Sequence, residues 1–152
     1  MSMTEKRSPS FIIGSRHMGR SYLVSIKGYS AILQKNVVGE MSDTHRQALK
    51  IVFDCCDTPI QSWNTLSELV EQNNDEKAME ILSQVDDTGQ SLLERNFISK
   101  SLSSMEIARN ASSAILRQAE QLTDEQRFYV EIIHKNCQGE IEVWKEIAEY
   151  FS

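Results

Sequence analysis

His17 is the side chain in this sequence with the clearest capacity for chemistry. It lies between Arg16 and Arg20, with Lys27 further along the same segment. A neutral imidazole is nucleophilic near pH 7, and nearby cations can stabilise a phosphoryl group. These residue types could support nucleophilic chemistry at His17, with Arg16, Arg20 and Lys27 as candidate binding residues for an anionic partner. The competing interpretation is that these residues form an ordinary solvated face.

The segment around His17 has the pattern of an amphipathic helix. Ser8 followed by Pro9 is a helix start signal, and the apolar periodicity continues to about Asn36. At about 100° per residue, His17 lies roughly 180° from Ile26, so its ring is expected to face away from the core. The expected core stripe consists of Met18, Tyr22, Ile26, Tyr29 and Leu33.

The rest of the chain also has helical periodicity. Gly39 predicts a break and Ser42 a new N-cap, and Pro59 predicts a kink within the helix that follows. A shorter helix is expected over 75–85, and the segment 91–119 could be one helix or two. Thr123 and Gln126 form a capping box at the start of a last helix that runs to about Phe151. The expected seams are Ala48, Val52, Cys55, Pro59, Trp63, Leu66 and Val70, and later Val130, Ile133, Cys137, Ile141, Trp144, Ala148 and Phe151.

Two parts of the chain resemble each other. The sequence SAIL occurs at 30–33 and again at 113–116, a shift of 83 residues, and the segments after it match at a shift of 81. The second match pairs Cys56 with Cys137 and Trp63 with Trp144. The first match pairs His17 with Lys100, so the histidine-bearing segment occurs once. Neither copy could hide its apolar face alone.

These patterns predict an all-α fold: a four-helix bundle of two repeated helical hairpins joined by a short extra helix. We expect one domain over 1–152, with hairpin copies at about 9–71 and 91–151 and a connecting helix at about 75–88. The path of the segment 72–96 stays open. The bundle could close within one chain or between two copies in a homodimer.

The region 16–70 resembles the dimerisation and histidine-phosphotransfer domain of bacterial sensor histidine kinases. His17, Arg20, Ser21 and Leu23 occupy positions of its phosphoacceptor motif, and the following IKGY at 26–29 continues the pattern. The MSD at 41–43 and the LTD at 122–124 are similar to the start of its second helix. The resemblance implies a hairpin that forms a four-helix bundle, with His17 as phosphoacceptor, Arg20 and Ser21 beside it, and a receiver domain or histidine kinase as partner.

Two substitutions depart from that motif. Met18 replaces the acidic residue that assists proton removal from the histidine, and Tyr22 replaces a proline. The chain ends at Ser152 with no ATP-binding domain after the bundle. We therefore expect no self-kinase activity and, at most, a histidine phosphotransfer protein.

The remaining candidates for chemistry have structural interpretations. The three cysteines, Cys55, Cys56 and Cys137, have no metal-ligand spacing and are expected to be buried reduced thiols. His45 and His134 are expected to be packed or edge histidines. Asp86 and Asp87 lie in an expected turn, where solvation explains them. We expect no metal and no cofactor.

Charge and hydropathy restrict the partners and the location. Residues 1–39 carry a net charge of +5 and the rest −11, which gives −6 overall. The basic start favours an anionic partner such as a phosphate or an acidic protein surface. No apolar run is long enough for a membrane helix, and the start of the chain has no signal-peptide pattern. We expect a cytoplasmic protein with no nucleic-acid or membrane partner.

Three hypotheses of function follow. The first is phosphotransfer or receiver docking at His17. The second is a non-catalytic interaction module, such as an adaptor or an inhibitor that imitates a kinase dimerisation domain. The third is a ligand-binding bundle, which predicts a sizeable apolar cavity between the helices.

Overall fold

The computed structural model describes residues 7–152 and is all-helical, as the periodicity predicts. Residues 1–6, on which the expectation of no signal peptide partly depends, lie outside the described residues. Extended pairing in the described part is limited to one bridge between Val85 and Ser91. The elements are α1 (Ser10–Gln34), α2 (Asp43–Cys55), α3 (Asp57–Gln72), α4 (Asp75–Leu82), the π-helical turn η1 (Glu94–Ile98), α5 (Ser99–Leu116), the 3-10 turn η2 (Ala119–Gln121) and α6 (Asp124–Phe151).

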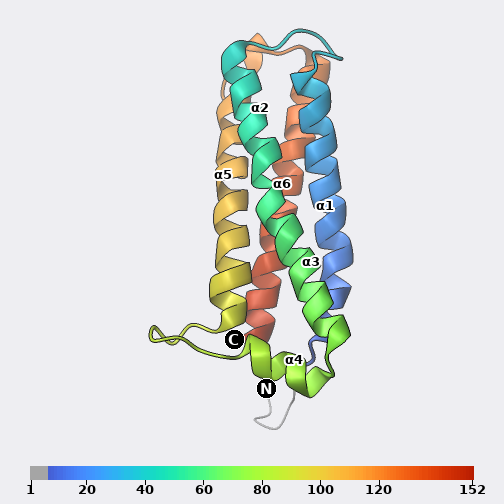
Figure 1. Cartoon of the computed structure of the whole chain (residues 1–152). Helices are drawn as coiled ribbons and strands as arrows, with labels where there is room; N and C mark the ends of the chain where they lie inside the picture. Colours follow the sequence, from blue (N-terminus) through green and yellow to red (C-terminus); the bar gives the residue numbers. More distant parts are fainter. Residues whose placement is uncertain (1–6) are drawn as a thin grey trace.

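The long helices lie side by side and alternate in direction (Figure 1). Helix α1 packs against α6 and against the line formed by α2 and α3, and α5 packs against the same neighbours from the other side. Helix α4 lies across the end of the molecule where α1 begins and α6 ends (Figure 1). No helix among the described residues is long and apolar enough to cross a membrane.

The expected starts of α2 and α6 are confirmed by their capping residues, whereas α1 begins at Ser10 after Pro9 without a side-chain cap. The Ser42 side chain accepts a hydrogen bond from the His45 backbone N–H at 3.1 Å, and α2 begins at the next residue. Thr123 and Gln126 form the reciprocal capping box that opens α6. Helix α1 ends at Gln34, before the expected break at Gly39. Asn36 and Gly39 follow in the connection to α2 with φ values of 58° and 106°, a left-handed conformation that favours glycine.

Pro59 produces the expected interruption between α2 and α3. Because proline has no N–H, the carbonyl of Cys55, four residues earlier, loses its helical partner. The Ser104 hydroxyl of α5 donates to that carbonyl at 2.8 Å and replaces the missing bond. The chain continues into α3 after Cys56, so the kink is tied to α5 without exposing an unpaired carbonyl.

The core face of α1 is rotated by about one residue from the expected stripe. Met18 was expected in the core but is 57% exposed, and Gly19 is buried in its place. Leu23 is buried while Tyr22 is half-buried. A helix with neighbours on two sides buries the face between them, and the periodicity of the sequence does not specify those neighbours. Ile26 and Leu33 are buried as expected.

The same small rotation occurs in α2, where Leu49 is buried and Ala48 is half-buried. At the kink, Cys56 is buried while Cys55 is half-buried. The α6 seam is buried as expected from Val130 to Trp144, whereas Ala148 and Phe151 are half-buried near its end.

The segment 91–119 is one continuous helical run from Leu92 to Leu116. It includes the π-helical turn η1, where one extra residue per turn changes which side chains face the core. The Ser99 hydroxyl donates to Glu94 Oε1 at 3.1 Å across this turn. The choice between one helix and two is thereby settled in favour of one.

Similar burial recurs at positions about 81 residues apart. Helices α2 and α6 begin 81 residues apart, and Trp63 and Trp144, also 81 apart, are both 0% exposed. The SAIL match has a shift of 83 residues, whereas α1 and α5 end 82 residues apart. The buried pairs at that shift are Gly19 with Ser101, Leu23 with Met105, Ile26 with Ala108, Ser30 with Ser112, and Leu33 with Ile115.

Candidate functional site

His17 lies in the second turn of α1 and is exposed, as the helix geometry predicts. Within residues 7–152, no hydrogen bond or ion pair involves its ring. Ser21, one turn further along α1, is also exposed. The imidazole is therefore accessible to a large partner.

The basic residues near His17 bind side chains of α3. Arg16 forms an ion pair with Glu71 at 3.0 Å, and Lys27 forms one with Asp57 at 2.7 Å. Both pairs are partly exposed and weak, but each balances the charge of its cation locally. The structure places these two residues beside α3 and leaves little free positive charge on them for an anion at His17.

Arg20 differs from the other two basic residues. Its guanidinium donates to the amide oxygen of Asn64 at 2.5 Å, and this partner is neutral. Arg20 lies about 60° from His17 around the helix axis, on the next turn. Within the described residues 7–152, Arg20 forms no ion pair, so it combines a fixed position near His17 with an unbalanced positive charge.

A shallow hollow of about 290 Å³ lies between α1 and α6 on the other side of His17. Met18 contributes to its wall, which explains how this exposed apolar side chain is accommodated on the surface. Glu146 supplies an acidic group at the same place. The residues that line the hollow are Phe11, Gly14, Ser15, Met18, Val143 and Glu146.

A second cluster with unusual chemistry lies in the core and was missed in the sequence. Glu140 is 0% exposed, and its Oε1 accepts the indole N–H of Trp63 at 3.0 Å. The rings of Trp63 and Trp144 stack with centroids 4.2 Å apart and planes inclined by 27°. A signal was available, because Glu140 falls between Cys137 and Trp144 at the three-four spacing of a core seam.

Burial raises the pKa of the Glu140 carboxyl to about 8, since a charged carboxylate loses its hydration in the core. The indole N–H groups of Trp63 and Trp144 oppose this shift. Trp144 lies close enough to act on the pKa but outside hydrogen-bond geometry, so Trp144 Nε1 and Glu140 Oε2 have no partner in the described structure. The carboxyl is therefore mainly neutral at pH 7.

The thiols near this cluster are unreactive. Burial raises the pKa of Cys137 to about 12 and raises that of Cys56 further, and Cys55 and Glu140 act in the same direction on both thiols. All three cysteines are free. They lack the electropositive, accessible surroundings of a catalytic thiolate.

The other two histidines are packed or at the edge of the core, as expected. The His45 ring is 2% exposed and hydrogen-bonds the Gln118 side chain at 2.8 Å. His134 is half-buried, with Nδ1 at 3.1 Å from the Ser112 hydroxyl. Among residues 7–152, no group of three histidine, cysteine or acidic side chains could hold a metal ion.

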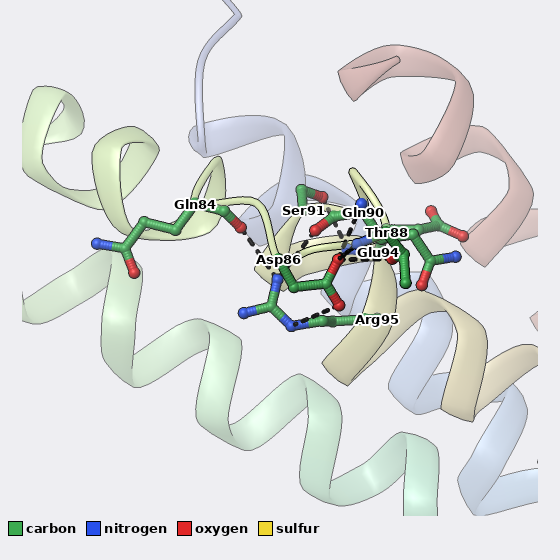
Figure 2. Close-up of polar contacts among 7 residues, drawn as sticks. All are labelled: Gln84, Asp86, Thr88, Gln90, Ser91, Glu94 and Arg95. Carbon is green, nitrogen blue, oxygen red and sulfur yellow. Dashed lines mark hydrogen bonds and ion pairs between the residues drawn. The ribbon is translucent and has the colours of Figure 1, made fainter.

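Asp86 organises the loop between α4 and η1 (Figure 2). Its Oδ1 accepts from the backbone N–H of Thr88 at 2.9 Å and from the Thr88 hydroxyl at 2.5 Å. These hydrogen bonds lower the pKa of Asp86. Arg95 donates to the carbonyls of Gln84 and Gln90, which closes the base of the loop. This explains Asp86 as a structural residue of an exposed turn.

A scan against protein-family models and searches among curated proteins and solved structures found no match to this chain.

Proposed function

We propose that this protein is a phosphotransfer or receiver-docking protein of the two-component type, with His17 as its phosphoacceptor. The observation that carries the proposal is the exposed His17 imidazole on the outer face of α1, beside Arg20, whose guanidinium is fixed by neutral Asn64. The partner under this proposal is the receiver domain of a response regulator or a histidine kinase. No self-kinase activity is proposed.

The proposal includes a four-helix bundle made of two copies of one hairpin within a single chain. The matching starts of α2 and α6, the shared burial of Trp63 and Trp144, and the 82-residue correspondence of α1 with α5 support it. One further relationship supports it. The buried side chain at the first turn of each second helix contacts the other copy's connection: His45 binds Gln118, and Gln126 donates to the carbonyl of Glu40 at 3.2 Å.

In the proposed reaction, a ring nitrogen of neutral His17 attacks the phosphorus of an aspartyl phosphate on a receiver domain. The bond between phosphorus and the aspartate oxygen breaks, a phosphorus–nitrogen bond forms, and the aspartate leaves as a carboxylate. Arg20 would stabilise the charge on the phosphoryl oxygens. The reverse transfer returns the group to a receiver.

The test is transfer from a receiver domain that has been labelled with acetyl phosphate. The wild-type protein should gain acid-labile phosphate, and His17→Ala should gain none. His134→Gln is the matched control because it alters a half-buried, hydrogen-bonded histidine and should still be labelled. Arg20→Ala should slow transfer more than Lys27→Ala, whose cation is already paired with Asp57. The proposal would be contradicted if the wild-type protein gained no phosphate from several receivers, or if the His17→Ala variant gained it.

A non-catalytic interaction module is the second candidate. The exposed Met18 stands where the resembling family has an acidic residue, and it borders a hollow that could take a partner side chain. Under this alternative, a kinase or receiver would bind wild-type protein and His17→Ala equally well, whereas Met18→Asp would weaken binding. A ligand-binding bundle has less support, because the stacked Trp63 and Trp144 fill the middle of the core.

A further inference from the structure

Glu140 is a carboxyl group enclosed by the core without a cation to balance it. It is 0% exposed, and in the part of the chain that the structure describes it takes part in no ion pair. Its one hydrogen-bond partner is the neutral indole of Trp63. A buried carboxylate with a single neutral donor is strongly disfavoured, whereas the protonated carboxyl is tolerated.

Trp63, whose indole N–H donates to Glu140, packs against the part of α1 that carries His17. The Trp63 ring lies directly against the backbone of Gly19, where an added Cβ would lie 2.5 Å from the ring. Gly19 is two residues after His17. On the α6 side, Gly139 has the Tyr22 ring of α1 in similarly close contact, at 2.6 Å from an added Cβ. The stretch 17–22 of α1 thus rests on Trp63 and on the turn of α6 that contains Glu140.

We propose that Glu140 is a proton-operated latch: in the neutral form it keeps Trp63 packed beneath the His17 segment of α1, and its ionisation loosens the packing of α1 on α3 and α6. Ionisation places a charge among groups that cannot hydrate it, so the charged form favours conformations in which water reaches the carboxylate. Opening requires separation of Trp63 from α6 and therefore also disturbs Gly19. The latch does not depend on whether His17 accepts phosphate.

The other titratable groups around the latch do not replace Glu140 as its source of pH dependence. The raised pKa values of Cys56 and Cys137 keep both thiols neutral through the range in which Glu140 ionises. Lys27 lowers the pKa of Cys56 and Arg109 lowers that of Cys137, but neither cation acts on the pKa of Glu140. Lys27 hydrogen-bonds Asp57, and Arg109 hydrogen-bonds Gln138. The groups facing this part of the core are Tyr22 from α1, Cys56 from the α2–α3 junction, Arg109 from α5 and Cys137 from α6.

Hydrogen exchange measured by mass spectrometry between about pH 6.5 and pH 9 tests the latch, after correction for the intrinsic pH dependence of exchange. In the wild-type protein, peptides covering 14–24 and 57–67 should lose protection by up to about tenfold per pH unit until the pH passes the pKa of Glu140. Glu140→Gln keeps the shape of the side chain and should show no such loss. Glu142→Gln, on an exposed position of the same helix, is the matched control and should behave as wild type.

Trp63→Phe provides an independent variant, because it keeps a ring over Gly19 but removes the N–H that favours the charged form. Without that N–H the pKa of folded Glu140 rises further, so the loss of protection should continue to higher pH than in the wild-type protein. Equal pH dependence in wild type and Glu140→Gln would overturn the proposal, as would a loss of protection confined to peptides outside α1 and α3. Phosphate transfer to His17 is not part of the readout, so the two proposals fail separately.

Discussion

Trp63 and Trp144 stack in the middle of the core, with ring centroids 4.2 Å apart, although 81 residues separate them in the chain. Trp63 comes from α3 and Trp144 from α6, so the contact joins two helices that are far apart in the sequence. Glu140 accepts the indole N–H of Trp63 beside this stack. The centre of the fold therefore combines its largest apolar side chains with its most deeply buried acid.

Replacement of Glu140 by glutamine should alter how stability depends on pH. The folded-state pKa of about 8 is raised from the usual value of 4.5, so the folded chain binds a proton more tightly than the unfolded chain does. This contribution is fully present below about pH 4.5 and is lost as the pH rises through about 8, at about 1.4 kcal/mol per pH unit. Urea denaturation of Glu140→Gln between about pH 5 and pH 9 should show a flatter profile than the wild-type protein. Parallel profiles would contradict a neutral Glu140.

Gly19 should not tolerate a larger residue. A Cβ at this position would lie 2.5 Å from the fully buried Trp63 ring, so the ring or the helix would have to shift. Gly19→Ala should lower the free energy of unfolding by about 1–3 kcal/mol. Gly28 in the same helix has open space around it, and Gly28→Ala should raise stability by up to about 1 kcal/mol through helix propensity. Chemical denaturation of both variants checks the contrast, and equal effects would disprove the close packing at Gly19.

The N-caps of α2 and α6 should contribute similarly to stability. Ser42 and Thr123 each accept a backbone N–H of the first turn at 3.1 Å. Ser42→Ala and Thr123→Ala should each lower the free energy of unfolding by about 1 kcal/mol. Ser103→Ala, on an exposed position within α5, is the control and should be neutral or slightly stabilising. Thermal denaturation measures all three; an unchanged midpoint in both cap variants would exclude the caps as stabilising contacts.

The three cysteines should differ in their rate of alkylation. Burial raises the pKa of all three thiols. Cys55 is half-buried, whereas Cys56 and Cys137 are buried. In native protein at about pH 8, iodoacetamide should modify Cys55 first, and the other two should react only after opening of the core. Mass spectrometry of partly alkylated protein identifies the site. Early modification of Cys137 would show that the core between α5 and α6 opens readily.

Local signals in the sequence predict the helices well. Ser42, Thr123, Gly39 and Pro59 act on their own turn of backbone, and each marks a boundary or kink that the structure contains. The exposure of His17 also follows from the local geometry of one helix. The duplication, the reaction and the partner remain proposals.

Other features depend on neighbours that the periodicity does not specify. Met18 has the spacing of a core residue, but α1 packs with Gly19 inward because the Trp63 ring occupies that place. The pairing of Arg16 with Glu71 and of Lys27 with Asp57 depends on where α3 lies. These contacts decide which cations near His17 are paired with a carboxylate and which one binds a neutral partner.

By itself, the sequence determines that the chain is all-helical, where α2 and α6 begin, and that His17 faces outward, since backbone geometry and caps act within a few residues. Only the tertiary structure decides the rotation of each helix and the burial of Glu140. The physical reason is that burial depends on two or more helices meeting at one place, so a carboxyl on a polar-looking stretch of α6 becomes a core residue when Trp63 and Trp144 close over it.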